Sequence, residues 1–144
     1  MSAVSVVDEY VQGLPGTTRR LGNGEWGITL PASQAGGWPL DVGVRVADGL
    51  LRVQAFALAA SDDVNPWNFL HWNRSTRLVR FACTRTGDIW VQGELPVPAV
   101  DERSVDRLLG LAVEGALAAR QAMAARAEPE ATGGAEPTGW GALR

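Results

Sequence analysis

The dipeptide Asp48-Gly49 lies between two runs of alternating residues, and it is the feature that most constrains the fold. Asp-Gly in this setting is the strongest short signal for a two-residue β-hairpin, because both turn positions need a positive φ angle. The apolar residues alternate as Val42, Val44 and Val46 before the turn and as Leu51, Val53, Ala55 and Ala57 after it, with Arg52, Gln54 and Phe56 on the other face of the second strand. The passage predicts two antiparallel strands with one buried face, the first running from Trp38 to Ala47.

Two further hairpins are indicated by turn residues between strand-like runs. Glycine and asparagine tolerate positive φ angles, and they separate both pairs of runs. The first pair is Thr17–Leu21 and Glu25–Leu30 around Gly22-Asn23-Gly24, and the second is Arg77–Cys83 and Asp88–Leu95 around Thr84–Gly87. In the second strand of the first hairpin, Trp26 and Ile28 share a face.

Three helices are predicted from periodicity and capping. Residues 2–12 place Val4, Val7 and Val11 on one face. The middle helix has Asn65 as N-cap and Pro66 at the first helical position, where its missing N–H costs nothing. Its periodicity aligns Trp67, Leu70 and Arg74. The last helix has Asp101 as N-cap and runs to about Ala127, with an apolar stripe made by Val105, Leu108, Leu109, Ala112, Ala116 and Ala119.

The order of these elements is helix, strands, helix, hairpin, helix. No strand is followed by the long crossover that a parallel sheet needs. We therefore predict an α+β fold, with three helices packed against a mainly antiparallel sheet. One domain is expected over residues 1–127. From Glu128 the composition turns to that of a flexible tail, residues 128–144, in which Trp140 is an aromatic that could dock.

Several short motifs from the middle helix onward resemble the YbjN family and the related type III secretion chaperone-like fold. The motifs are Phe69-Leu70 leading into Asn73-Arg74, Arg80-Phe81-Ala82, Gly87-Asp88, Gly93-Glu94-Leu95-Pro96 and Leu108-Leu109-Gly110. The resemblance covers about residues 42–119. It implies a small homodimeric protein that binds segments of other proteins and is associated with regulation of the stress response.

Composition argues against several classes of protein. The net charge is -3 and every basic residue is an arginine, so no global basic field favours nonspecific nucleic-acid binding. The single cysteine, Cys83, cannot form an internal disulfide, the N-terminus has no secretion signal, and no uninterrupted apolar run approaches the roughly 20 residues that span a bilayer. A cytoplasmic location without membrane contact is expected.

No group of residues indicates catalysis, a cofactor or a metal. His71, the only histidine, has no nearby partners for a nucleophile-base pair or a zinc site. Cys83 alternates with Val79 and Phe81 and is expected to be a buried small hydrophobe. Gly22-Asn23-Gly24 lacks the lysine and the following helix of a phosphate-binding loop. The sequence predicts no catalytic, cofactor-binding or metal-binding residue.

The six tryptophans are more than a core of this size needs. Trp67 and Trp72 are five residues apart on a helix and cannot both face inward. Trp90 alternates with Ile89 and Val91, so either the tryptophan or the aliphatic pair is left on the outer face of that strand. Large apolar groups on an outer face usually mark an interface. The predicted protein-interface residues are Trp67, Trp72, Trp90, Arg74, Arg77, Arg80 and Phe56.

These residues favour a non-enzymatic, chaperone-like or regulatory module that binds a client polypeptide, with an extended segment added along an exposed strand edge. The client could be a stress-related or nucleic-acid-handling protein, and a homodimer is expected. Two alternatives stay open. Arg74, Arg77, Arg80 and Arg85 lie near Trp72, Phe81 and Trp90 in sequence, which is a composition found in single-stranded nucleic-acid platforms. The net negative charge of the chain argues against direct contact with nucleic acid. The other alternative is an enzyme with a site built around His71.

Overall fold

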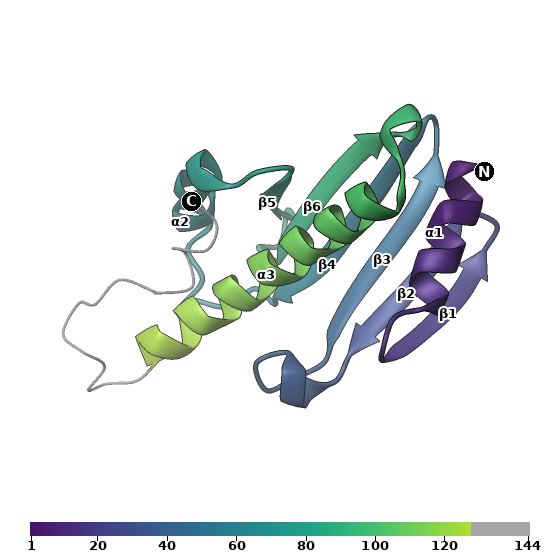
Figure 1. Ribbon diagram of the computed structural model, residues 1–144. Coiled ribbons are helices and arrows are strands. Elements are labelled where there is room, and N and C mark those ends of the chain that lie inside the picture. Colours follow the sequence, from purple (N-terminus) through teal and green to yellow (C-terminus); the bar gives the residue numbers. More distant parts are fainter. Residues whose placement is uncertain (128–144) are drawn as a thin grey trace.

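The computed structural model describes residues 1–127 of the chain (Figure 1). The predicted tail, residues 128–144 with Trp140, lies outside the described residues. In chain order the elements are α1 (Ala3–Gln12), β1 (Thr17–Gly22), β2 (Glu25–Leu30), the 3-10 turn η1 (Ala32–Gln34), β3 (Leu40–Ala47), β4 (Leu50–Leu58), α2 (Pro66–Trp72), η2 (Asn73–Ser75), β5 (Val79–Cys83), β6 (Ile89–Pro96), η3 (Val97–Ala99) and α3 (Glu102–Ala127).

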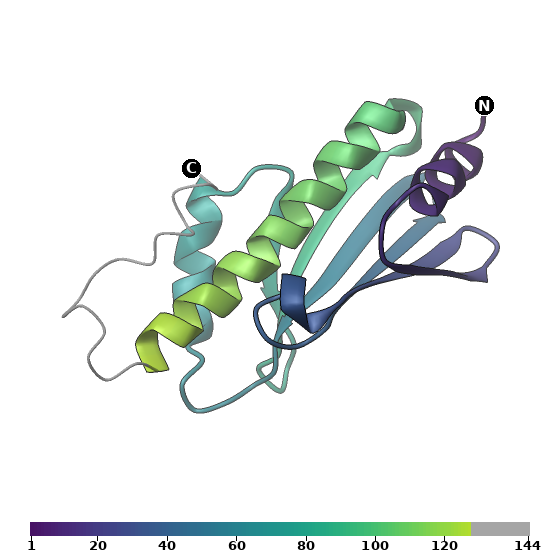
Figure 2. The same ribbon diagram turned by 60° about the horizontal axis from the view of Figure 1, so that its bottom comes forward.

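The six strands form one antiparallel sheet in the order β1-β2-β3-β4-β6-β5. Figures 1 and 2 show α1 and α3 lying over the same face of the sheet, and α2 sits beside β5. Within residues 1–127 no helix covers the opposite face, which we call the outer face. The predicted α+β class and the order of its elements are confirmed.

The Asp48-Gly49 hairpin forms as predicted. Asp48 and Gly49 have φ angles of 55° and 76°, and Ala47 pairs with Leu50 across the turn. The apolar face of β4 is fully buried, with 0% exposure at Leu51, Val53, Ala55 and Ala57. The strand before the turn begins at Leu40 rather than at the predicted Trp38. The carbonyls of Trp38 and Pro39 accept hydrogen bonds from a side chain of α3 instead.

A reciprocal pair of hydrogen bonds begins α3 at the predicted N-cap. The Ser104 amide donates to Asp101 Oδ1 over 2.7 Å, and the Asp101 amide donates to Ser104 Oγ over 2.9 Å. Hydrogen bonding of the Asp101 carboxyl by Ser104, above all by its backbone amide, holds the pKa of that carboxyl below its usual range. Every residue of the predicted apolar stripe of α3 is buried. The cap and the stripe therefore fix both the start and the orientation of this helix.

By length and composition alone, the segment Glu102–Arg126 of α3 is apolar enough to cross a membrane, although half of its most apolar stretch is buried inside the protein. A core helix of a soluble protein passes the same test. The alternation of buried and exposed residues along α3 explains why no uninterrupted apolar run is visible in the sequence.

Helix α1 is tied to the rest of the core by two polar contacts. The Trp26 indole N–H donates to Asp8 Oδ1 over 2.9 Å, and the Tyr10 hydroxyl donates to Asp106 Oδ1 over 2.6 Å. Burial, with the bond to Asp106 and its charge, raises the pKa of Tyr10. Trp26 is 1% exposed and is among the largest fully buried side chains. At least one of the six tryptophans is therefore a core residue and not surplus.

Gly93 in β6 lies directly beneath α3. A Cβ atom built on Gly93 would be 2.8 Å from Leu108 Cδ1 and 2.9 Å from both the Leu78 carbonyl oxygen and Val79 Cγ1. Carbon atoms that do not bond to each other are normally about 3.5–4.0 Å apart. The missing side chain therefore lets α3 and the start of β5 approach the sheet closely.

Candidate functional site

Helix α2 displays apolar residues on its exposed side. The Asn65 side chain accepts a hydrogen bond from the Trp67 amide over 3.1 Å, and Pro66 begins the helix, as predicted. The face that carries Trp67 and Leu70 points outward, with exposed fractions of 75% and 59%. Inward, Phe69 is buried, and its ring centroid lies 5.1 Å from that of Trp72 and 5.2 Å from that of Phe81. The helix is thus anchored by Phe69 and leaves Trp67 and Leu70 available.

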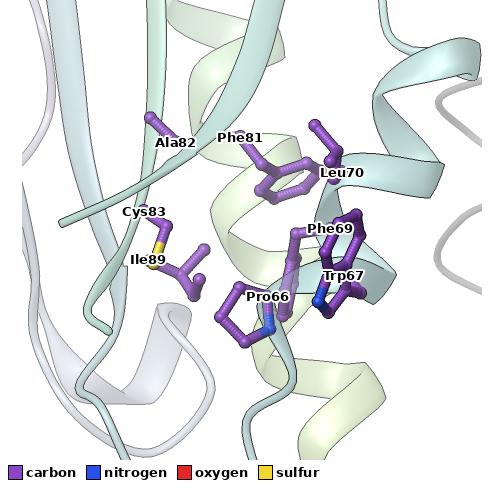
Figure 3. Close-up of a pocket in the computed structure, with 8 residues that line it drawn as sticks. All are labelled: Pro66, Trp67, Phe69, Leu70, Phe81, Ala82, Cys83 and Ile89. Atoms are coloured by element: carbon purple, nitrogen blue, oxygen red, sulfur yellow. The ribbon is translucent and has the colours of Figure 1, made fainter. Parts of the chain in front are cut away.

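A pocket opens beside these residues, between α2 and the ends of β5 and β6 (Figure 3). We call it the α2 pocket; its volume is about 190 Å³. Its lining is almost wholly apolar and consists of Pro66, Trp67, Phe69, Leu70, Phe81, Ala82, Cys83 and Ile89. In Figure 3, Pro66, Trp67 and Phe69 line the helix side, and Phe81, Cys83 and Ile89 line the strand side. A cavity of this kind is suited to an apolar side chain.

The prediction that Cys83 is buried is wrong. Cys83 is exposed, and its thiol donates a hydrogen bond to the Thr84 carbonyl over 3.1 Å. Alternation does put it on the same face as Val79 and Phe81, which are buried. Cys83 is the last residue of β5, however, and at this end of the strand it lines the open α2 pocket instead of being covered by a helix.

The edge of β5 is occupied at its centre by a side chain. The Phe81 amide donates to Asn73 Oδ1 over 2.7 Å, and Asn73 Nδ2 donates to the Phe81 carbonyl over 3.0 Å. The Asn73 amide group thereby takes the place that an added strand would use at Phe81. Among the described strands, β1 is the other edge of the sheet.

The outer face of the sheet carries a second aromatic group. Ile89 and Val91 are fully buried, so the alternation places Trp90 on the outer face, as one of the two predicted arrangements requires. Its ring centroid lies 5.1 Å from that of Phe56, and Phe56 lies 6.1 Å from Trp38. We call these three residues, Trp38, Phe56 and Trp90, the aromatic row.

The predicted interface residues are therefore divided between two surfaces. Trp67 lines the α2 pocket, and Trp72 is half-buried against Phe69 on the same helix. Phe56 and Trp90 lie on the outer face, where Arg80 forms an ion pair with Glu94 over 3.2 Å. Arg74 and Arg77 are exposed on the segment between α2 and β5.

The arginine and aromatic residues of the nucleic-acid alternative do not form one platform. Phe81 is buried on the helix side of the sheet, whereas Trp90 and Arg80 lie on the outer face. A stacking platform needs its aromatic rings beside its cations on one surface. The division of these residues removes the observation that motivated this alternative.

His71 is exposed on α2, and residues 1–127 contain no cluster of three or more histidine, cysteine, aspartate or glutamate side chains that could hold a metal ion.

Sequence reasoning missed Arg120, which is 5% exposed within α3. Its guanidinium donates to the carbonyls of Ala57, Ala35, Trp38, Pro39 and Phe56 over 2.6–3.2 Å. It also lies 3.4 Å from the ring centroid of Trp38, at cation-π distance. Burial lowers the pKa of Arg120, an effect that the charge of Asp41 partly opposes. The sequence does carry a signal for this burial, because Arg120 follows Ala116 by four residues and so lies on the apolar stripe of the helix.

Comparison with protein families gives one match that covers more than half of the chain. The family model YbjN, described as a "putative bacterial sensory transduction regulator", matches residues 44–125. A search of curated protein sequences found no match.

Solved structures with similar folds include chains of two protein complexes. A chain of the Yersinia pestis type III secretion chaperone SycH, in complex with a stable fragment of YscM2, superimposes with a TM-score of 0.57. It is 15% identical, and the match covers 81% of this chain and 98% of that one. A chain of the ExsC-ExsE complex matches with a TM-score of 0.49 and 16% identity, over 81% of this chain and 92% of that one. The first likeness shows that this fold is of the type III secretion chaperone kind.

Proposed function

The chain belongs to the YbjN family, and from this premise we propose that it is a non-enzymatic, chaperone-like module that binds a segment of a client polypeptide. Residues 1–127 form the binding unit of this proposal. The SycH structure contains a fragment of another protein, YscM2. That observation concerns SycH, and it supports a polypeptide as the class of partner proposed for this chain.

The α2 pocket is the observation that carries the proposal. Trp67 and Leu70 are largely exposed beside a cavity whose lining is almost entirely apolar. Keeping large apolar side chains in water is unfavourable, and burying each one against a partner is worth roughly 1.5–3 kcal/mol. Tryptophan is also enriched among the residues that dominate binding energy at interfaces. The site is therefore suited to an apolar side chain of a client.

The structure restricts how an extended client could add to the sheet. Asn73 occupies the β5 edge at Phe81, so strand addition there would have to displace two hydrogen bonds of 2.7 and 3.0 Å. The β1 edge is the alternative, because β1 is exposed over most of its length. We propose that any strand addition uses β1, with the α2 pocket as a separate anchor.

The client site is tested by a paired change on α2. Trp67→Ser together with Leu70→Ser is expected to weaken client binding at least tenfold, which corresponds to about 1.4 kcal/mol or more. The measurement is selection of a phage library of random 12-residue peptides on the immobilised full chain, followed by titration of the recovered peptides. His71→Ser is the matched control, since His71 is exposed on the same helix and does not line the pocket.

Failure to enrich any peptide would contradict the proposed function. Enriched peptides that bind the double variant as tightly as the original chain would contradict the α2 pocket as the site. His71→Ser should leave the affinity unchanged.

We propose that the protein is a homodimer, as the family resemblance implies. The exposed apolar surface of α2 is consistent with a second use as a subunit contact. Light scattering is expected to give a mass of twice the 15.3 kDa of one chain. A mass near that of one chain at every concentration would contradict the dimer.

A cytoplasmic location, which the composition of the chain predicts, and a regulatory role in a stress response, which the family resemblance implies, complete the proposal. Cell fractionation tests the location. Growth of a deletion strain under stress, compared with the parent strain, tests the role.

A further inference from the structure

The outer face of the sheet is organised as rows of side chains that cross the strands. Residues paired in register lie side by side on one face, so each row can be read from the strand pairing. The middle row runs Arg19, Gly27, Gly43, Gln54, Gln92 and Arg80. Two adjacent glycines and two planar amides thus lie between an arginine at each end.

Gly27 and Gly43 make the middle row a channel. A Cβ atom built on Gly43 meets nothing within 4 Å, and one built on Gly27 meets only the Arg19 guanidinium, at 3.3 Å. The resulting groove has a volume of about 410 Å³, and Arg45, Arg52, Gln54 and Trp90 are among its lining residues. At Gly43 the floor is bare backbone, which allows another backbone to approach closely, whereas the Arg19 guanidinium lies against Gly27.

The two rows that border the channel differ in chemistry. On one side lie Thr29, Asp41, Phe56 and Trp90, of which only Phe56 and Trp90 belong to the aromatic row. On the other side a charged row runs Glu25, Arg45, Arg52 and Glu94. A molecule lying in the channel therefore meets charge on one flank, and on the other it meets Thr29 and Asp41 over β2 and β3 and aromatic rings over β4 and β6.

The charges of this face leave an excess of arginine. Arg45 is paired with Glu25 over 3.3 Å, whereas Arg52 and Arg80 share Glu94, each over 3.2 Å. Two guanidinium groups that share one carboxylate can still bind a further anion, and arginine can form bidentate hydrogen bonds with carboxylates. The face thus has a positive excess on a chain whose net charge is -3.

We infer that this channel binds an extended client segment in which carboxylate side chains alternate with apolar ones. This inference rests on the proposed function. Successive side chains of an extended segment point to opposite sides, so its carboxylates would face the charged row and its apolar groups the aromatic row. The amides of Gln54 and Gln92 can both donate to and accept from the backbone of the segment.

The length of the segment follows from the sheet. Neighbouring strands are about 4.8 Å apart, and the groove is lined by residues of β1 to β4 and by Trp90 of β6, so it is about 19 Å long, or about six extended residues.

The test uses the full chain and fluorescence anisotropy with three labelled probes. They are the peptide Gly-Glu-Leu-Glu-Leu-Glu-Leu-Gly, the same peptide with lysine in place of glutamate, and an oligothymidylate. The glutamate peptide is expected to bind at least tenfold more tightly than the lysine peptide. Gly43→Gln fills the channel and should weaken the binding of the glutamate peptide at least tenfold. Gly110→Gln is the matched control, because Gly110 is exposed on α3 with nothing within 4 Å of an added Cβ, and it should leave the affinity unchanged.

Equal affinities for the two peptides, or an affinity for the glutamate peptide that Gly43→Gln leaves unchanged, would overturn the inference. Tighter binding of the oligothymidylate, lost in Gly43→Gln, would overturn it in favour of nucleic acid. These failures are distinct from failure of the proposed function. Library peptides that need Trp67 and Leu70 but ignore Gly43→Gln would leave the α2 site standing and remove only the channel.

Discussion

Replacing Arg120 with alanine is expected to lower the free energy of unfolding by about 3–5 kcal/mol, the range found when one partner of a buried charged contact is removed. The guanidinium donates to five backbone carbonyls from two segments, the loop before β3 and the end of β4. Each carbonyl left buried without a donor costs about 1–3 kcal/mol, less where water can reach it. The loss should appear as a lower urea midpoint at an unchanged slope.

Two further variants separate the geometry of Arg120 from its charge. Arg120→Lys keeps the charge but has no planar fork, so it should recover only part of the loss. Arg126→Ala removes an arginine that is exposed near the end of the same helix, and its effect should stay within about 0.5 kcal/mol. If Arg120→Ala and Arg126→Ala have the same midpoint, the hydrogen bonds of Arg120 contribute nothing net to stability.

Arg120 also connects the core with the outer face. Its guanidinium lies against the Trp38 ring, which contacts Phe56, which in turn contacts Trp90. Trp38 is 36% exposed and belongs to a loop, so without Arg120 little in the described residues orients its ring. The aromatic border of the proposed channel therefore depends on a residue buried on the other side of the sheet.

The local patterns of the sequence were sufficient to predict the elements of this fold. Asp48-Gly49, the Asn65-Pro66 pair and the Asp101 cap each act over a few residues, and each forms as expected. The order of elements then limits the topology, because antiparallel neighbours need only short connections. The strand order, with β6 between β4 and β5, is not a local property and was not predicted.

The candidate site was predicted only in part, because burial depends on what lies across from a strand. Alternation separated Trp90 from Ile89 and Val91 but left open which of the two sides faces outward. The same alternation places Arg80 and Phe81 on opposite faces of β5, so their closeness in sequence does not bring them together on one surface. Cys83 has the alternation of a buried residue and is exposed, since α2 covers β5 only as far as Phe81. Neither Gly27 nor Gly43 on its own indicates a groove in the sequence. They form a channel only because the register of β2 and β3 pairs them.

Gly93→Ala is expected to destabilise the protein by about 2–3 kcal/mol, in the upper part of the range for adding volume to a packed core. The added Cβ would lie within 3.0 Å of three atoms, and one of them is the Leu78 carbonyl oxygen, which belongs to the backbone. Leu78 already has a φ angle of 61°, which is unfavourable for a branched, non-glycine residue, so this segment has little freedom to move away. Either α3 must rise from the sheet at Leu108 or β5 must shift at its first residues.

Gly43→Ala provides the matched control for this prediction. Gly43 is also a strand glycine with a backbone conformation open to other residues, but its Cβ would meet nothing within 4 Å. Alanine there should be neutral or slightly stabilising, since glycine within a strand loses more conformational freedom on folding. Urea unfolding followed by tryptophan emission compares the two variants directly, because Trp26 is buried in the same core. Equal midpoints for the two alanine variants would show that α3 can move off Gly93 at little cost, and the close approach would then not be what fixes the position of this helix.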